Sequence, residues 1–422
     1  MIIVILVFIA LLVLGVPISV SIGVSAIAGC FALDYNLVTI GQQMVNGIDS
    51  FLLIAIPLFI LAGNLMNAGN ITGKIFDTAR ALVGWIPGGL GHANVVASVV
   101  FAGMSGSAVA DAGGLGTIEM EAMTKNGYDE DFSAAITAAS SVIGPIFPPS
   151  IPLVIYGSVA SVSVAKLFMG GVVPALIMAI TLMVMVAIYA VIRKYERTPF
   201  SLKVLVHEFM SSIPALITPL IILSGFTLGW FTPTEASSIA VVYALFVSIV
   251  VYKSMTWENF KKCLLDSAIS SANTLFIIGT STLFTYLMAM EGVSRQMADA
   301  LMSISSNPNV ILLLINILLL VLGMFMEPGA ILTLMLPVLI PIATTLGLDM
   351  VYFGVVIVLN LMIGQVTPPF GVCLFVIADC NKIKLEVLYK SIMPFLIPLI
   401  LTLLLVTYCP AIVTTLPNAL LG

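Results

Sequence analysis

Charged residues are what this sequence has least of. Asp, Glu, Lys and Arg make up 8% of its 422 residues, whereas hydrophobic residues make up 60%. An ordinary soluble domain carries roughly 25% charged residues, so this chain cannot form the polar shell that a soluble fold needs. The 15 basic residues are scattered and the formal net charge is −5, which argues against a nucleic-acid surface. The composition therefore predicts an all-α integral membrane protein.

Residues for catalysis and metal binding are also scarce. The two histidines, His92 and His207, stand far apart, and none of the five cysteines forms a C-x-x-C pair. The sequence shows no zinc-ligand spacing, no H-E-x-x-H and no nucleophile–base pair at membrane depth. These absences argue against an enzyme, and we expect no catalytic residue, no transition-metal site and no cofactor.

Long apolar stretches are abundant, and most are near the ~20 residues that cross hydrocarbon. The first begins at residue 2 without the basic segment and cleavage site of a signal peptide, so we expect it to be retained as the first span. Two amphipathic segments, 71–86 and 257–269, either lie along the interface or are plain connecting loops. The apolar stretches are 2–33, 51–67, 89–120, 132–162, 166–192, 212–231, 233–252, 270–290, 308–345, 351–378 and 391–416.

Two of these stretches are too long for one crossing and are interrupted at the centre. Residues 89–120 contain FAGMSGSAVADAGGLG, and residues 308–345 contain GMFMEPGAI. A break at membrane depth leaves backbone groups unpaired, which is tolerated only inside protein or beside a water-filled cavity. We predict that both stretches are re-entrant helical hairpins.

The basic residues indicate the orientation of the chain. With a cytoplasmic N-terminus and non-crossing hairpins, 13 of the 15 basic residues fall inside, and only Lys166 and Arg295 fall outside. The positive-inside rule predicts such an asymmetry. We therefore expect a multi-pass protein with a cytoplasmic N-terminus and a C-terminus on the opposite side of the membrane.

The two halves of the chain align at a constant offset of 220 residues. IGPIFPPSIPLVIYG, from Ile143, meets IGQVTPPFGVCLFVI, from Ile363, with the double proline in register. The predicted topology places the first break in an outward-running span and the second in an inward-running one. We predict two inverted-topology repeats, each with a hairpin and a discontinuous transmembrane helix at about 132–162 or 351–378.

These breaks offer the oxygens that a small hard cation needs. Ser105 and Ser107 supply hydroxyls opposite the carbonyls near Gly144 and Phe147, and Thr367 takes the place of Phe147 in the second repeat. Unwound backbone supplies further carbonyl oxygens. Small residues also serve helix packing, but for the G-x-S-G-S cluster inside a hairpin we favour an ion site.

Asp111 and Glu327 are the acidic residues placed deepest in the membrane, where an ionisable group is a functional-site hypothesis by default. The alternative for Asp111 is that its side chain caps the helix in the second arm of its hairpin. Glu119 and Glu121 lie nearer the predicted interface, where solvent or Lys125 would satisfy them.

The chain closely resembles the large membrane subunit of tripartite ATP-independent periplasmic (TRAP) transporters, within the wider ion-transporter superfamily. The resemblance covers the whole chain and rests on FAGMSGSAVADAGGLG at 101–116, PIFPPSIPLVIYG at 145–157 and GQVTPPFGVCLFV at 364–376. It implies an elevator mechanism, in which a transport domain slides across the bilayer against a scaffold. The implied division is scaffold helices in 1–87 and 201–307, and transport-domain halves in 88–200 and 308–422.

The resemblance also implies functional residues. The first sodium site would use Ser105, Ser107, Gly144, Phe147 and Pro149, several of them through carbonyls. The second would be the repeat-related set Glu327, Gly364, Thr367 and Pro369, although Glu327 could instead couple transport to protons. Substrate-side candidates are Asp111, Pro328, Gly329 and Gln365.

The implied function is sodium-coupled import of an organic acid: a C4-dicarboxylate, sialic acid or another sugar acid, or a keto acid. The implied partners are a periplasmic solute-binding protein and a small four-helix membrane subunit, expected as a separate chain because the first span begins at residue 2. The alternative is a stand-alone ion-coupled organic-anion symporter of the same superfamily.

The predicted orientation can be tested by cysteine labelling in a cysteine-free background. Single cysteines replacing Lys194 or Lys262 should react only from the cytoplasm, whereas cysteines replacing Glu291 or Gly422 should react from the periplasm. Periplasmic labelling at position 194 would overturn the orientation.

Overall fold

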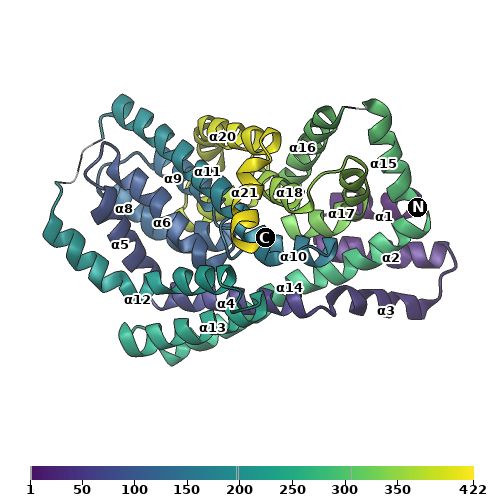
Figure 1. Ribbon diagram of the computed structural model, residues 1–422, viewed down its shortest axis with the longest axis horizontal. Coiled ribbons are helices and arrows are strands. Elements are labelled where there is room, and N and C mark those ends of the chain that lie inside the picture. The colour runs from purple at the N-terminus through teal and green to yellow at the C-terminus, as the bar shows by residue number, and fades with distance from the viewer. Residues whose placement is uncertain (1, 196, 198, 306) are drawn as a thin grey trace.

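The computed structural model describes residues 2–195, 197, 199–305 and 307–422, and this part of the chain contains helices and loops but no strand (Figure 1). The helices of the first half are α1 (Ile2–Val13), α2 (Ile18–Ala32), α3 (Leu37–Ile48), η1 (Phe51–Ile54), α4 (Ala55–Ala68), α5 (Ile71–Val83), α6 (Gly89–Ser105), α7 (Ala108–Ala110), η2 (Asp111–Leu115), α8 (Gly116–Lys125), α9 (Glu130–Ser141), α10 (Ile151–Ala160) and α11 (Val164–Arg193). The second half contains α12 (Leu202–Thr227), α13 (Pro233–Phe246), η3 (Val247–Val251), α14 (Trp257–Met290), α15 (Val293–Ile304), α16 (Pro308–Phe325), α17 (Pro328–Thr345), α18 (Met350–Gly364), α19 (Val372–Asn381), α20 (Leu385–Tyr408) and α21 (Ala411–Leu421).

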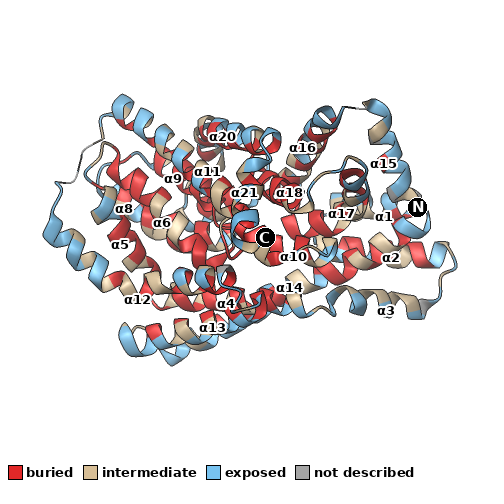
Figure 2. Cartoon of the chain, viewed as in Figure 1, coloured by how far each residue is buried: buried red, intermediate tan, exposed pale blue. Residues whose placement is uncertain are grey.

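The helices divide into an inner set and an outer set. From Phe132 to Ser141 every residue of α9 is buried, and so is every residue of α18 from Tyr352 to Gly364 (Figure 2). Eight helices within the described residues are long and apolar enough to cross a membrane. In α11, only 33% of the residues in its most apolar 18-residue segment are buried inside the protein. An apolar face left uncovered by protein is what contact with lipid requires. The membrane protein predicted from composition is confirmed at the level of an all-helical fold.

The first apolar stretch differs from expectation. Residues 2–33 were predicted as one span, but the structure divides them into α1 and α2, which contact each other. The chain turns at Gly15, with a φ of 76°, and Pro17 follows directly. At 1.5 Å per residue, neither helix alone reaches the ~30 Å thickness of the hydrocarbon layer. Two common helix-breaking residues therefore outweigh an otherwise continuous apolar pattern.

The four predicted interruptions are present. The first hairpin stretch breaks between α6 and α7, at Gly106 and Ser107, and the second breaks between α16 and α17, at Met326 and Glu327. The predicted discontinuous helices break between α9 and α10 and between α18 and α19.

Helix ends in the two halves agree with the 220-residue offset. α6 ends at Ser105 and α16 at Phe325, whereas α7 begins at Ala108 and α17 at Pro328. The second arms of these hairpins end at Lys125 and Thr345. Equal spacing of corresponding elements supports an internal repeat, while the opposite orientation of the two halves across the bilayer remains a prediction.

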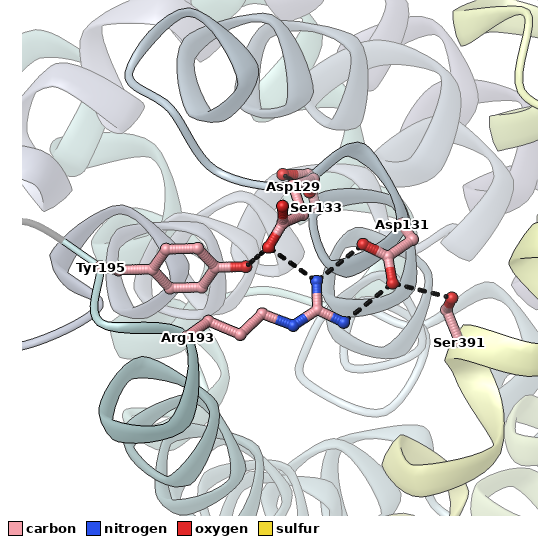
Figure 3. Close-up of polar contacts among 6 residues, drawn as sticks. All are labelled: Asp129, Asp131, Ser133, Arg193, Tyr195 and Ser391. Carbon is pink, nitrogen blue, oxygen red and sulfur yellow. Dashed lines mark hydrogen bonds and ion pairs between the residues drawn. The ribbon is translucent and has the colours of Figure 1, made fainter.

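A polar network joins the two halves at the ends of α9, α11 and α20 (Figure 3). The Arg193 guanidinium donates to both carboxylate oxygens of Asp131, over 2.7 and 2.9 Å, and to Asp129 over 2.8 Å. The Tyr195 hydroxyl donates to Asp129 over 2.8 Å, and Ser391 of α20 donates to Asp131 over 3.4 Å. This network fixes the first half of the chain to the second because Ser391 lies in the second half.

The network also lowers the pKa values of its two aspartates, Asp129 and Asp131. Hydrogen bonds from Tyr195 and Arg193 hold the pKa of Asp129 below its usual range, and hydrogen bonding to Arg193 does the same for Asp131. A depressed pKa means that the carboxylates stabilise the fold fully above their unfolded pKa of about 3.9. That stabilisation is lost as the pH falls through the lower, folded values.

We predict that Arg193→Ala lowers the free energy of unfolding at pH 7 by about 1–3 kcal/mol, since it removes three charge-assisted hydrogen bonds from a site only partly open to solvent. Lys125→Ala is the matched control, because its pair with Glu121 is exposed and worth less than about 1 kcal/mol. Thermal unfolding in detergent measures both. Equal effects of the two variants would contradict a stabilising role for the network.

Candidate functional site

The interrupted elements surround a cavity of about 500 Å³. Both hairpin breaks and both discontinuous helices contribute to its wall, and α4 and α14 complete it. Among the residues singled out from the sequence, those that line the cavity are Ser105, Ser107, Glu327, Pro328, Gly329 and Gln365. The others, Gly144, Phe147, Pro149, Gly364, Thr367, Pro369 and Asp111, do not belong to the lining. Residues more than 200 positions apart thus share one wall.

The first predicted ion site is assembled around Gly106. This residue has a φ of 60°, and a β-carbon built on it would lie 2.5 Å from the Pro149 carbonyl oxygen. A β-carbon built on Gly144 would lie 3.5 Å from the Ser107 carbonyl oxygen. The structure therefore brings the hairpin break against the broken helix, as the sequence predicted for Ser105, Ser107, Gly144 and Pro149.

Several oxygens in this region are unused. The Ser105 hydroxyl is buried and has no hydrogen-bond partner among the described residues. Over the same part of the chain, no hydrogen bond is donated to the carbonyl oxygens of Gly144, Phe147 or Pro149. The Ser107 hydroxyl, by contrast, accepts the Ala110 amide over 3.3 Å and caps the second arm of the hairpin. Buried polar atoms without partners are rare in native folds and mark a place where a ligand supplies the missing contact.

The second predicted site is built differently. A β-carbon on Gly364 would lie 2.7 Å from the Gly323 Cα, so at this point the hairpin and the broken helix touch through backbone. Thr367 donates its hydroxyl to the Ile363 carbonyl over 2.7 Å, and the Pro369 carbonyl accepts the Tyr389 hydroxyl over 2.5 Å. The Pro369 carbonyl is thus engaged as an acceptor within the protein, whereas the Thr367 oxygen, which donates its hydrogen, keeps its lone pairs.

Glu327 is the residue of this second set that faces the cavity. It precedes α17 as its N-cap, without a side-chain capping bond, and its side chain is exposed to the cavity. Pro328 and Gly329, the first residues of α17, line the cavity beside it.

Asp111 does not line the cavity. It is fully buried in η2, where its Oδ1 accepts the Ser98 hydroxyl over 3.4 Å. It is not the helix cap either, because Ser107 occupies that position. The expectation for Glu119 was wrong: it is fully buried and accepts the Asn94 side-chain amide over 2.7 Å, whereas Lys125 pairs with Glu121.

Sequence reasoning missed the polar residues on the opposite wall of the cavity. Asn64 of α4 and Ser270, Asn273 and Thr274 of α14 all line it. The Asn64 amide also donates to Ser267 of α14 over 2.8 Å, which ties these two helices together. An asparagine inside an otherwise apolar stretch was the available signal.

The electrostatics of the cavity come from helix ends rather than from basic side chains. Its described lining contains Glu327 but no Lys, Arg or His. The first residues of α10, α17 and α19, which are Ile151, Pro328 and Val372, all lie in the wall. A helix N-terminus carries a partial positive charge and unpaired amide hydrogens, so such a wall suits an anion.

Comparisons with a family model and with known proteins point to the same family. Residues 5–412 match the family model described as the DctM component of the tripartite ATP-independent periplasmic transporter. The chain is 42% identical to the sialic acid TRAP transporter large permease protein SiaM of Vibrio cholerae, over 98% of each chain. It is 37% identical to the C4-dicarboxylate large permease protein DctM of Rhodobacter capsulatus, over 98% of this chain and 97% of that one.

A solved structure has a similar fold. The YdaH transporter of Alcanivorax borkumensis, described as having an unusual topology, superimposes with a TM-score of 0.66 over 89% of each chain. The sequence identity is 13%, so this likeness concerns the fold alone.

Proposed function

Since this chain belongs to the DctM family, the large permease components of tripartite ATP-independent periplasmic transporters, we propose that it imports an organic acid with sodium by an elevator mechanism. The observation that carries the proposal is the cavity at the meeting point of the four helix breaks, bordered by unused oxygens. Sodium is held by a shell of several oxygens, and backbone carbonyls at broken helices supply them in transporters.

The first sodium site would consist of the Ser105 and Ser107 oxygens with the carbonyls of Gly144, Phe147 and Pro149. Its support is the contact of Gly106 with Pro149 and the unpartnered Ser105 hydroxyl. The second site would use Glu327 with Gly364, Thr367 and Pro369. Its support is the Thr367 oxygen, whose lone pairs remain available because the hydroxyl donates to Ile363, and the Glu327 side chain at the cavity.

The substrate would lie in the cavity with its carboxylate toward the N-termini of α10, α17 and α19. Its hydroxyl or carbonyl groups would meet the side-chain amides of Asn64, Asn273 and Gln365, which line the same space. Relatives are named for sialic acid, isethionate, C4-dicarboxylate and 2,3-diketo-L-gulonate transport. We propose an organic acid of this general class, and we assign Asp111 no contact with it.

In the elevator proposal, residues 88–200 and 308–422 move as one transport domain against residues 1–87 and 201–307. The cavity supports this division, because its lining combines the helix breaks of the proposed moving part with α4 and α14 of the proposed scaffold. The network around Arg193 supports it too, since α9, α11 and α20 all belong to the proposed moving part.

The proposed partners are a periplasmic solute-binding protein and a small four-helix membrane subunit, in the inner membrane. A relative of similar identity, the sialic acid permease protein SiaT of Haemophilus influenzae, is longer, and the match covers 68% of it.

Reconstituted uptake tests the assembly. We predict that vesicles containing this chain, the small subunit and the binding protein take up the acid only when a sodium gradient is present. Vesicles that lack either partner should accumulate nothing. Strong uptake by the chain alone would favour the stand-alone symporter instead.

The first sodium site predicts a specific loss for Ser105→Ala. Its hydroxyl makes no hydrogen bond within the described protein, so stability should be kept. A contact to a charged group is worth about 1.5–3 kcal/mol, so the sodium concentration for half-maximal uptake should rise by about one to two orders of magnitude.

Ser281→Ala is the matched control for this experiment. Its hydroxyl is equally buried and equally unpartnered among the described residues, but it lies on α14 outside the cavity lining. It should leave the sodium dependence unchanged. The same sodium dependence in wild type and Ser105→Ala would remove Ser105 from the site.

A further inference from the structure

A second buried polar cluster lies inside the first hairpin, behind the cavity. Glu119 and Asp111 are both 0% exposed, and each uses one carboxylate oxygen, toward Asn94 and Ser98 respectively. The other oxygens, Glu119 Oε1 and Asp111 Oδ2, have no hydrogen-bond partner in the described part of the chain. An ionised carboxylate so poorly satisfied and so deeply buried is strongly disfavoured.

No basic group compensates for these acids. α8 packs against α6, η2, α9 and α19, and the titratable group that faces Glu119 from these elements is Asp111, another acid. His92, on α6, forms no hydrogen bond or ion pair with Glu119 in the described chain, and its Nδ1 is buried without a partner there. Asp131 is bonded to Arg193, Asp379 to Lys382 and Glu121 to Lys125. Glu130 is exposed, and Cys373 lies beside Asp111.

The fold does not require this cluster. At the 220-residue offset, Asp111 and Glu119 correspond to Ile331 and Leu339, which are also buried. The second hairpin is therefore built with apolar residues where the first carries two acids. The two hairpins also differ in backbone where the acids lie, because the second arm of the first hairpin contains the π-helix η2 at Asp111–Leu115, whereas α17 is a continuous α-helix. The acids therefore accompany a local feature that the second hairpin lacks.

The surroundings of Glu119 suit a proton better than a sodium ion. Its nearest polar neighbour is the Asn94 amide nitrogen, a hydrogen-bond donor that also donates to Thr137 over 2.8 Å. The Asn94 oxygen accepts the Ser140 hydroxyl over 2.7 Å, so it is Asn94 Nδ2, a donor, that Glu119 meets. Sodium needs several oxygens, whereas one proton on Glu119 Oε1 neutralises the group and leaves Oε2 to accept from Asn94.

We propose that Glu119 binds a proton in the moving domain, in addition to the sodium ions bound elsewhere. Glu119 would exchange this proton with water through the cavity. One face of α6 offers the route: Asn94, Ser98 and Ser105 follow at intervals of four and seven residues, and Ser105 lines the cavity. A proton from water binds the carboxylate, forming one O–H bond, and returns to water on the other side. This transport role depends on the proposed function.

Infrared spectroscopy of the purified chain tests the proton itself, independently of transport. The wild type at pH 7 should show the carbonyl stretch of a protonated carboxylic acid, and Glu119→Gln should lose part of this band. Glu121→Gln, an exposed neighbour on the same helix, is the control and should leave the band unchanged. Absence of the band from the wild type, or its full retention in Glu119→Gln, would overturn the proposal.

Uptake at saturating sodium tests the transport role. The wild type and Glu121→Gln should acidify the vesicle interior during uptake and lose uptake as the external pH rises. Glu119→Gln mimics the neutral acid, so it should keep sodium dependence but lose both the proton movement and the pH dependence. Sodium-driven wild-type uptake without proton movement would overturn the proposal and leave the sodium-coupled function intact.

If Glu119→Gln does not fold, absence of the infrared band or of proton movement in the wild type still overturns the proposal. If reconstituted wild type shows no uptake at all, the proposed function fails, and the infrared band still reports whether Glu119 binds a proton.

Discussion

The four helix breaks at the cavity are governed by one constraint: a backbone amide or carbonyl within the hydrocarbon layer must find a partner. Breaks are therefore confined to places where protein or a water-accessible cavity replaces lipid. The four interruptions in the apolar helices satisfy this condition together, because they meet at one cavity. The unsatisfied groups that a break creates then become the oxygens and amides with which a polar solute can be bound.

The fold was predictable where composition and periodicity act over long stretches. The two hairpin breaks follow from Gly and Ser around position 106 and from Pro328, and the two broken helices follow from the paired prolines. The division of residues 2–33 into two helices was not predicted, because two helix-breaking residues, Gly15 and Pro17, stand in a long stretch of apolar residues that otherwise resembles one span. A single positive φ angle, which composition does not reveal, decides the turn there.

The site was predictable in part. The residues that line the cavity from the helix breaks carry unusual local sequences, so they could be named in advance. Asn64 and Asn273 carry a signal as asparagines inside apolar stretches, but their place at the cavity depends on packing between distant segments, which the sequence alone does not give. Glu119 was misplaced for a related reason: distance along the chain placed it near the interface, but neighbouring helices cover it.

The backbone contact between Gly323 and Gly364 has a mechanical consequence. No flexible side chain separates the two elements at this point, so there is little that can compress or rotate between them. A displacement of the second hairpin at Gly323 must therefore move the broken helix at Gly364 by nearly the same distance. The second hairpin and its broken helix can then respond to an occupant of the cavity as a single stiff unit.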